Sequence, residues 1–189
     1  MRPGESQVIT RDCDATQIPS GIPYRIAAGT SVRLMQALGG SYTVMTDHGY
    51  MVRIDARDAD VLGLSTEAQP DAATQEFSDK LVWDLLRTVY DPEIPVNVVD
   101  LGLIYDCQIT PVEEGNQINI KMTMTAPGCG MADVLKNDIQ RRMAGLPTVK
   151  GVNVEVVFEP PWNPTRMSEG ARLQLGLDLD PQSFPLYGR

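Results

Sequence analysis

One cysteine has the sequence surroundings of a reactive thiol. Cys129 lies in the segment Pro127-Gly128-Cys129-Gly130, between a predicted strand and a predicted helix. The unpaired N–H groups and the dipole at a helix N-terminus stabilise a thiolate and lower its pKa. Glycines on both sides leave the sulfur uncrowded and permit positive φ. We therefore expect Cys129 to be an exposed, nucleophilic thiol able to bind a metal; the alternative is an inert small residue at the junction.

A second group of candidates consists of three carboxylates within ten positions. Asp91, Glu93 and Asp100 lie in a segment made stiff by prolines, one of them Pro92. Carboxylates can serve as oxygen ligands of a metal or as a base in proton transfer. The simpler explanation is that Asp91-Pro92 ends a helix and Glu93 is solvated. Asp100 is harder to explain in this way, because it opens a strand close to Gly102.

The small number of thiols and imidazoles excludes several kinds of site. The chain has three cysteines, without C-x-x-C spacing, and one histidine, His48. The chain therefore cannot build a four-ligand zinc or iron–sulfur site alone. A Ser-His or Cys-His catalytic arrangement would have to use His48, which lies in a predicted turn. Cys107 alternates with apolar residues and is expected in the core. Cys13 lies between two aspartates, which raise a thiol pKa, and is expected on the surface without a role.

The charge balance argues against binding to polyanions. The 189 residues include 25 acidic and 16 basic side chains, a formal net charge of −9. This balance disfavours nucleic acids and anionic membranes as partners. The chain has no apolar run of about 18 residues and no secretory signal pattern. We therefore expect a cytoplasmic protein.

The N-terminal third has the pattern of a small β-rich domain. Short runs of strand-forming residues are separated by Gly- and Pro-containing turns, which is typical of a small barrel or open sheet. These runs cover residues 8–10, 24–26, 32–35, 42–45 and 50–54. We assign residues 1–64 to this domain and the small, polar residues 65–75 to a linker.

The remaining sequence indicates a two-layer α+β domain over residues 76–160. Apolar positions at helical spacing predict helices over 77–89 and 134–146, and alternating positions predict strands over 103–109, 118–124 and 152–158. The order is α-β-β-α-β, with both helices on one face of the sheet. Residues 161–189 are expected to form a C-terminal helix, capped by Asn163, and an irregular tail.

Three motifs together resemble one known family. They are Asp91-Pro92-Glu93-Ile94-Pro95, Asp100-Leu101-Gly102-Leu103-Ile104 and Thr125-Ala126-Pro127-Gly128-Cys129. In this order they resemble the small iron–sulfur cluster assembly domains, a family that includes SufT, PaaD and the eukaryotic cytosolic iron–sulfur targeting factors. The resemblance covers residues 76–160. The β-rich N-terminal extension and the segment that follows residue 158 resemble SufT in particular, and residues 165–189 lack the cysteines usual in PaaD.

The resemblance implies a non-catalytic factor for the maturation of iron–sulfur proteins, either a carrier or an adaptor. Its partners would be the assembly machinery and client apo-proteins. Cys129 would be the functional thiol and the cluster or metal ligand, with a motif surface around it made of Asp91, Pro92, Glu93, Asp100, Gly102, Pro127, Gly128 and Gly130. A [2Fe–2S] or [4Fe–4S] cluster normally takes four ligands. One thiol could therefore hold only a transient cluster, shared with a partner or with the second subunit of a homodimer.

Two other classes of protein stay open at this point. One is a protein-interaction module with an incidental thiol. The other is a redox enzyme that uses Cys129 as its nucleophile. The enzyme is the less favoured, because no resolving cysteine is close in sequence and His48 belongs to the other predicted domain. We therefore expect no catalytic residues.

Overall fold

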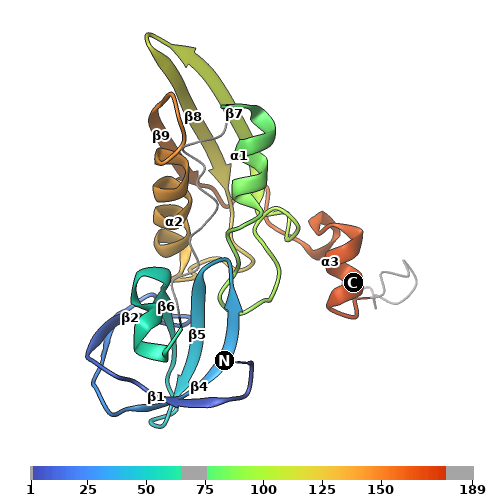
Figure 1. Ribbon diagram of the computed structural model, residues 1–189. Coiled ribbons are helices and arrows are strands. Elements are labelled where there is room, and N and C mark those ends of the chain that lie inside the picture. Colours follow the sequence, from blue (N-terminus) through green and yellow to red (C-terminus); the bar gives the residue numbers. More distant parts are fainter. Residues whose placement is uncertain (1, 65–75, 178–189) are drawn as a thin grey trace, which may run out of the picture.

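The computed structural model describes residues 2–64 and 76–177 (Figure 1). The expected linker 65–75, and residues 178–189 of the expected tail, lie outside the described residues. Residues 2–64 form an antiparallel sheet, here called the N-terminal unit, and residues 76–177 form a second unit of helices over a smaller sheet. The predicted α+β class is confirmed.

The sheet of the N-terminal unit has six strands in the order β1-β4-β5-β6-β2-β3, all antiparallel. Their bounds are β1 Ser6–Val8, β2 Cys13–Gln17, β3 Pro23–Ile26, β4 Ser31–Leu38, β5 Ser41–Thr46 and β6 Met51–Asp55. A 3-10 helix, η1 (Ala56–Leu62), packs on β5 and β6. Its Val61 and Leu62 share one apolar core with Leu34 and Val44.

Strand β2 was not predicted, and the expectation for Cys13 was wrong. Cys13 is 3% exposed and lies opposite Ile26 of β3. Burial, followed by the charge of Asp58, raises the pKa of the thiol, which is the predicted direction. The sequence pattern did not indicate this strand because its buried face carries only small residues, Cys13 and Ala15.

The second unit has the predicted order of helices and strands. It consists of α1 (Asp79–Leu86), β7 (Ile104–Val112), β8 (Gly115–Met122), α2 (Ala132–Ala144) and β9 (Val149–Val156). The sheet order is β7-β8-β9, with β7–β8 antiparallel and β8–β9 parallel across the connection through α2. Both helices bury their apolar faces in one core with the sheet. No helix in the described parts of the chain is long and apolar enough to cross a bilayer.

A β-bulge at the start of β7 changes the expected faces of two residues. Strict alternation would place Tyr105 on the core face and Ile104 outside. The register shifts between Ile104 and Asp106, so Tyr105 is the extra residue. Ile104 pairs with the buried Met122, whereas the ring of Tyr105 lies against the Arg166 guanidinium at 4.2 Å.

The predicted C-terminal helix is two short pieces instead of one. Asn163 caps a 3-10 turn, η3 (Pro164–Arg166), by accepting the N–H of Thr165 at 3.1 Å. The backbone is extended at Met167, and Ser168 then caps α3 (Glu169–Gln174). In Figure 1, α3 lies at the side of the second unit.

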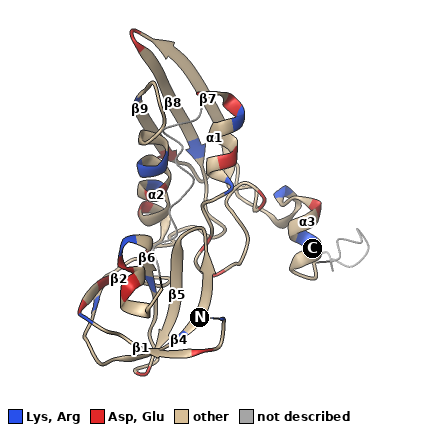
Figure 2. Ribbon diagram, viewed as in Figure 1, with Lys and Arg blue, Asp and Glu red and all other residues tan. Residues whose placement is uncertain are grey.

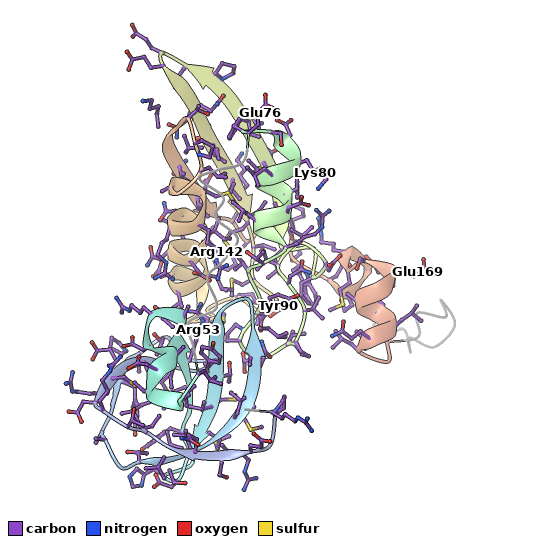
Figure 3. The ribbon with its side chains drawn as sticks, in the orientation of Figure 1. Arg53, Glu76, Lys80, Tyr90, Arg142 and Glu169 are labelled. Atoms are coloured by element: carbon purple, nitrogen blue, oxygen red, sulfur yellow. The ribbon has the colours of Figure 1, made fainter. Side chains whose placement is uncertain are left out.

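A buried group of charges joins the two units. Arg53 of β6 contacts Asp138 of α2, with Nη2 and Oδ2 3.1 Å apart, and Asp138 also contacts Arg142 at 3.3 Å. Arg142 in turn donates to the carbonyl of Gly39 at 2.6 Å and to the hydroxyl of Thr88 at 2.9 Å. Figure 2 shows both basic and acidic residues on α2, and Figure 3 shows Arg53 and Arg142 where the N-terminal sheet meets this helix.

Candidate functional site

Cys129 lies in the loop between β8 and α2, three residues before the first residue of the helix. It is a half-buried free thiol. Its carbonyl accepts the N–H of Ala132 at 3.2 Å, and its sulfur accepts the backbone N–H of Met131. The structure therefore places the thiol at the N-terminus of α2, the position expected from the sequence.

The expected lowering of the thiol pKa is wrong. The pKa of Cys129 is raised, first by burial and then by the negative charges of Asp91 and Glu93. The hydrogen bond from Met131 lowers the pKa but does not outweigh these effects. Cys129 is therefore a neutral thiol at pH 7 in the isolated chain.

Asp91 forms a buried turn instead of ending a helix. Helix α1 already stops at Leu86. The Oδ1 atom of Asp91 accepts the N–H groups of Glu93 and Ile94, both at 2.9 Å, and the residue is 5% exposed. Burial raises the pKa of both Asp91 and Glu93. Folding thus brings a carboxylate pair close enough to Cys129 to act on its charge, although 36 residues separate Glu93 from Cys129 in the chain.

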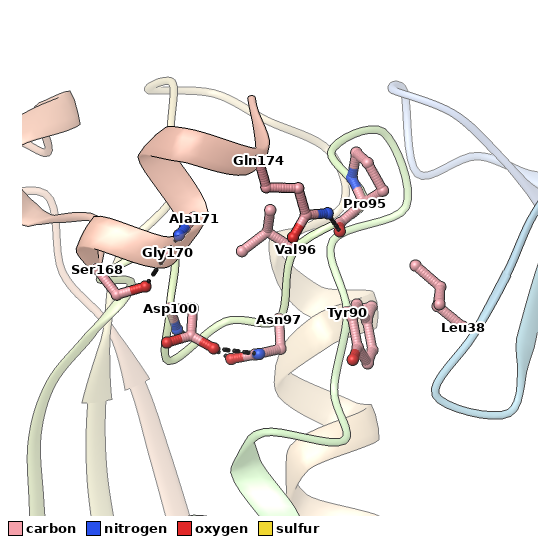
Figure 4. A pocket seen from close by; sticks show the side chains of 10 residues that line it. All are labelled: Leu38, Tyr90, Pro95, Val96, Asn97, Asp100, Ser168, Gly170, Ala171 and Gln174. Carbon is pink, nitrogen blue, oxygen red and sulfur yellow. Dashed lines mark hydrogen bonds between the residues drawn. The ribbon is translucent and has the colours of Figure 1, made fainter. Parts of the chain in front are cut away.

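Asp100 and Gly102 hold the C-terminal segment. The side chain of Asn97 donates to Asp100 Oδ2 at 2.6 Å, and the backbone carbonyl of Asp100 accepts the N–H of Ser168 at 2.8 Å. Gly102 has φ +70°, and a Cβ there would collide with the backbone of Arg166. Asp100 lines a cavity of about 490 Å³ between this loop and α3 (Figure 4). The backbone contacts of Asp100 and Gly102 therefore serve to pack this part of the chain against the C-terminal segment.

The two glycines beside Cys129 have different roles. Gly128 has φ +76° with open space around a Cβ, so it serves the turn itself. Gly130 lies against the N-terminal unit, where a Cβ would collide with the carbonyl of Ser20. Pro127 is exposed at the tip of the loop. The close approach of Ser20 had no signal in the sequence.

The other candidate groups have the expected placements. His48 is exposed in the turn before β6. Cys107 is half-buried against the core, and burial raises its pKa to about 11. Among the residues that the structure describes, no three His, Cys, Asp or Glu side chains gather closely enough to hold a metal ion. The donor set therefore does not fit a resident iron–sulfur cluster.

Comparison with known proteins identifies the family of the second unit. Residues 79–156 match the iron–sulfur cluster assembly protein family. The Fe-S protein maturation auxiliary factor of Porphyromonas gingivalis is 49% identical over 92 residues, which are 49% of this chain and 85% of the relative. The factor YitW of Bacillus subtilis is 38% identical, and the match covers 54% of this chain and 98% of YitW. SufT of Staphylococcus aureus is 32% identical, and the match covers 47% of this chain and 98% of SufT. The predicted resemblance is confirmed: the chain belongs to the iron–sulfur cluster assembly protein family.

Proposed function

We propose that this chain is a non-catalytic maturation factor for iron–sulfur proteins and that it acts as an adaptor in the cytoplasm. Its relatives include Fe-S protein maturation auxiliary factors, with no enzyme activity in their names. The observation that carries the adaptor role is the setting of Cys129: a single thiol of raised pKa beside Asp91 and Glu93. Such a thiol can engage a partner without holding a cluster of its own.

Electrostatics support this choice over a resident cluster. A cluster ligated by four thiolates places several negative charges in one small volume. The carboxylates of Asp91 and Glu93 would repel those charges, because like charges at short range disfavour each other. We therefore expect the cluster and its thiolate ligands to stay on the assembly machinery and the client apo-proteins.

A carrier role is the second candidate. The sulfur of Cys129 already accepts the N–H of Met131, which favours the thiolate, and a bound metal deprotonates a thiol outright. A transient cluster shared with a partner, or with a second subunit of a homodimer, would satisfy the need for four ligands. The carrier requires that a second chain complete the site.

The function is tested in cells with two cysteine variants. Cys129→Ser should lower the activities of endogenous iron–sulfur enzymes, whereas Cys107→Ala should leave them at the wild-type level. Circular dichroism and soluble protein amounts establish that both variants fold. Normal enzyme activities with Cys129→Ser would sink the proposal and favour an interaction module whose thiol is incidental.

Anaerobic reconstitution with iron and sulfide separates the adaptor from the carrier. The adaptor predicts no stoichiometric cluster on the isolated chain. A visible absorption band at one cluster per chain, or per dimer, that is lost in Cys129→Ser would establish the carrier instead.

A further inference from the structure

The N-terminal unit touches the backbone next to Cys129. A Cβ at Gly21 would collide with the carbonyl of Gly130, and a Cβ at Gly130 would collide with the carbonyl of Ser20. The turn at residues 20–21 and the loop at residue 130 thus meet backbone to backbone, with no room for a side chain on either. This contact fixes the loop one residue away from the sulfur.

The same unit also holds the segment that carries Asp91. The side-chain amide of Gln36, on β4, donates to the carbonyl of Asp91 at 2.9 Å. The hydroxyl of Thr43, on β5, donates to the carbonyl of Pro92 at 3.1 Å, and this hydrogen bond is buried. The loop that carries Cys129 and the segment that carries Asp91 therefore both contact the N-terminal unit.

The buried charges described above anchor this arrangement. The side chains of Arg53 and Asp138 are each 4% exposed, and Asp138 also contacts Arg142 at 3.3 Å. Asp138 lies in α2, the helix that begins just after the Cys129 loop. Ile18 of the N-terminal unit is 5% exposed and belongs to the apolar core of the second unit, so apolar as well as charged side chains are buried between the two units. The N-terminal unit is therefore docked on the second unit.

We infer that the N-terminal sheet is a positioning unit for the Cys129 loop: it screens one side of the thiol and fixes the loop relative to the segment of Asp91. A partner must then approach Cys129 from the side that the sheet leaves open. Gly21, Gln36 and Thr43 are the positioning residues, because they touch the two segments and not the sulfur. The importance of this positioning for the maturation of iron–sulfur proteins rests on the function proposed above, whereas the contacts between the two units do not depend on that function.

The test compares two glycine substitutions in the full chain. Gly21 and Gly29 have similar positive φ, +71° and +87°, so alanine strains the backbone at both. Only Gly21→Ala introduces a collision with the Cys129 loop, since a Cβ at Gly29 meets nothing within 4 Å. The probe is iodoacetamide, with the rate at each thiol followed by mass spectrometry across a range of pH. The limiting rate above the inflection reports access to the sulfur, separately from its protonation.

The chain contains its own controls for folding. Cys13 is buried in the N-terminal unit, and Cys107 is half-buried in the second unit. We expect Gly21→Ala to raise the limiting rate at Cys129 several-fold, with Cys13 and Cys107 unchanged, and Gly29→Ala to raise none of the three. An unchanged rate at Cys129 in folded Gly21→Ala would overturn the inference.

A second variant decides the case in which Gly21→Ala unfolds and exposes all three thiols. The double substitution Gln36→Leu and Thr43→Val removes both polar contacts to the Asp91 segment and adds no bulk at the Cys129 loop. It should raise the rate at Cys129 about two-fold or more while Cys13 stays protected. A wild-type rate at Cys129 in this folded variant would refute the positioning role.

Discussion

Asp138 is the residue whose removal should most weaken the junction of the two units. It is 3% exposed and contacts Arg53, Arg141 and Arg142 at 3.1, 2.8 and 3.3 Å. Asp138→Asn keeps the shape but leaves two buried guanidinium groups without their shared counter-charge. Loss of one partner of a buried pair costs about 3–5 kcal/mol. Because Asp55 still pairs with Arg53 at 2.8 Å, we expect the lower end, about 3 kcal/mol.

Urea unfolding measures this loss directly. With a slope of about 2 kcal/mol per molar urea, the midpoint should fall by about 1.5 M. The matched control is Asp84→Asn, which breaks exposed pairs with Lys80 and Arg87 and should cost at most about 1 kcal/mol. Asp138→Asn should cost clearly more than this control.

The pH dependence gives a second signature of the same residue. Burial opposes ionisation of Asp138, but Arg142 and Arg53 outweigh it and hold its pKa below the ordinary 3.8. A carboxylate with a depressed folded pKa stabilises the fold above its unfolded pKa, and this stability is lost as the pH falls through the folded value. The difference between wild type and Asp138→Asn should therefore be full at pH 6 and shrink below about pH 3.8. A difference no larger than that of Asp84→Asn, or one independent of pH, would refute the reasoning.

The thiol and the loop at residues 87–103, between α1 and β7 and here called the motif loop, provide further tests. The iodoacetamide rate at Cys129 should inflect at a higher pH than that of a cysteine peptide measured in parallel, because burial and acidic neighbours raise its pKa; an equal or lower inflection would contradict this. Asp91→Asn keeps an acceptor oxygen for its turn but removes a negative charge, so the inflection of Cys129 should move to lower pH while circular dichroism stays unchanged. An unmoved inflection would show that Asp91 does not act on the thiol. Trp162→Phe removes an indole N–H that donates to the carbonyl of Leu101 at 2.8 Å, and should lower the free energy of unfolding by about 0.5–1.5 kcal/mol in urea; an unchanged urea midpoint would count against this contact.

Most helices and strands could be predicted because their periodicity is strong. Ile118 and Ile120, which alternate on β8, are both buried as expected. The failures occurred where periodicity is weak or interrupted. Strand β2 buries only small residues, and the extra residue Tyr105 shifts the alternation of β7 by one. The bulge at Tyr105 contains no glycine, the residue that marks one class of bulge, so the local sequence does not distinguish it from a regular strand.

For the candidate site, too, local features could be predicted from the sequence, whereas features that depend on tertiary contacts could not. The position of Cys129 at a helix start is local, and the boundary between the strand and helix patterns was enough to predict it. The pKa of its thiol depends on burial and on Asp91 and Glu93, which reach it only through tertiary folding. The contact between Gly21 and Gly130 is likewise invisible in the sequence, because a glycine required by close packing resembles a glycine required by a turn.

Two side chains that hold the motif loop lie outside the segment that matches the family. On one side, Gln36 donates to the carbonyl of Asp91. On the other, Trp162 donates to the carbonyl of Leu101. Residues 79–156 contain the two acceptors and neither donor. Since a backbone carbonyl is present whatever the side chain, such contacts constrain the path of the loop without constraining its sequence. The flanking segments therefore help to set the geometry of the loop in this chain without imposing side chains on it.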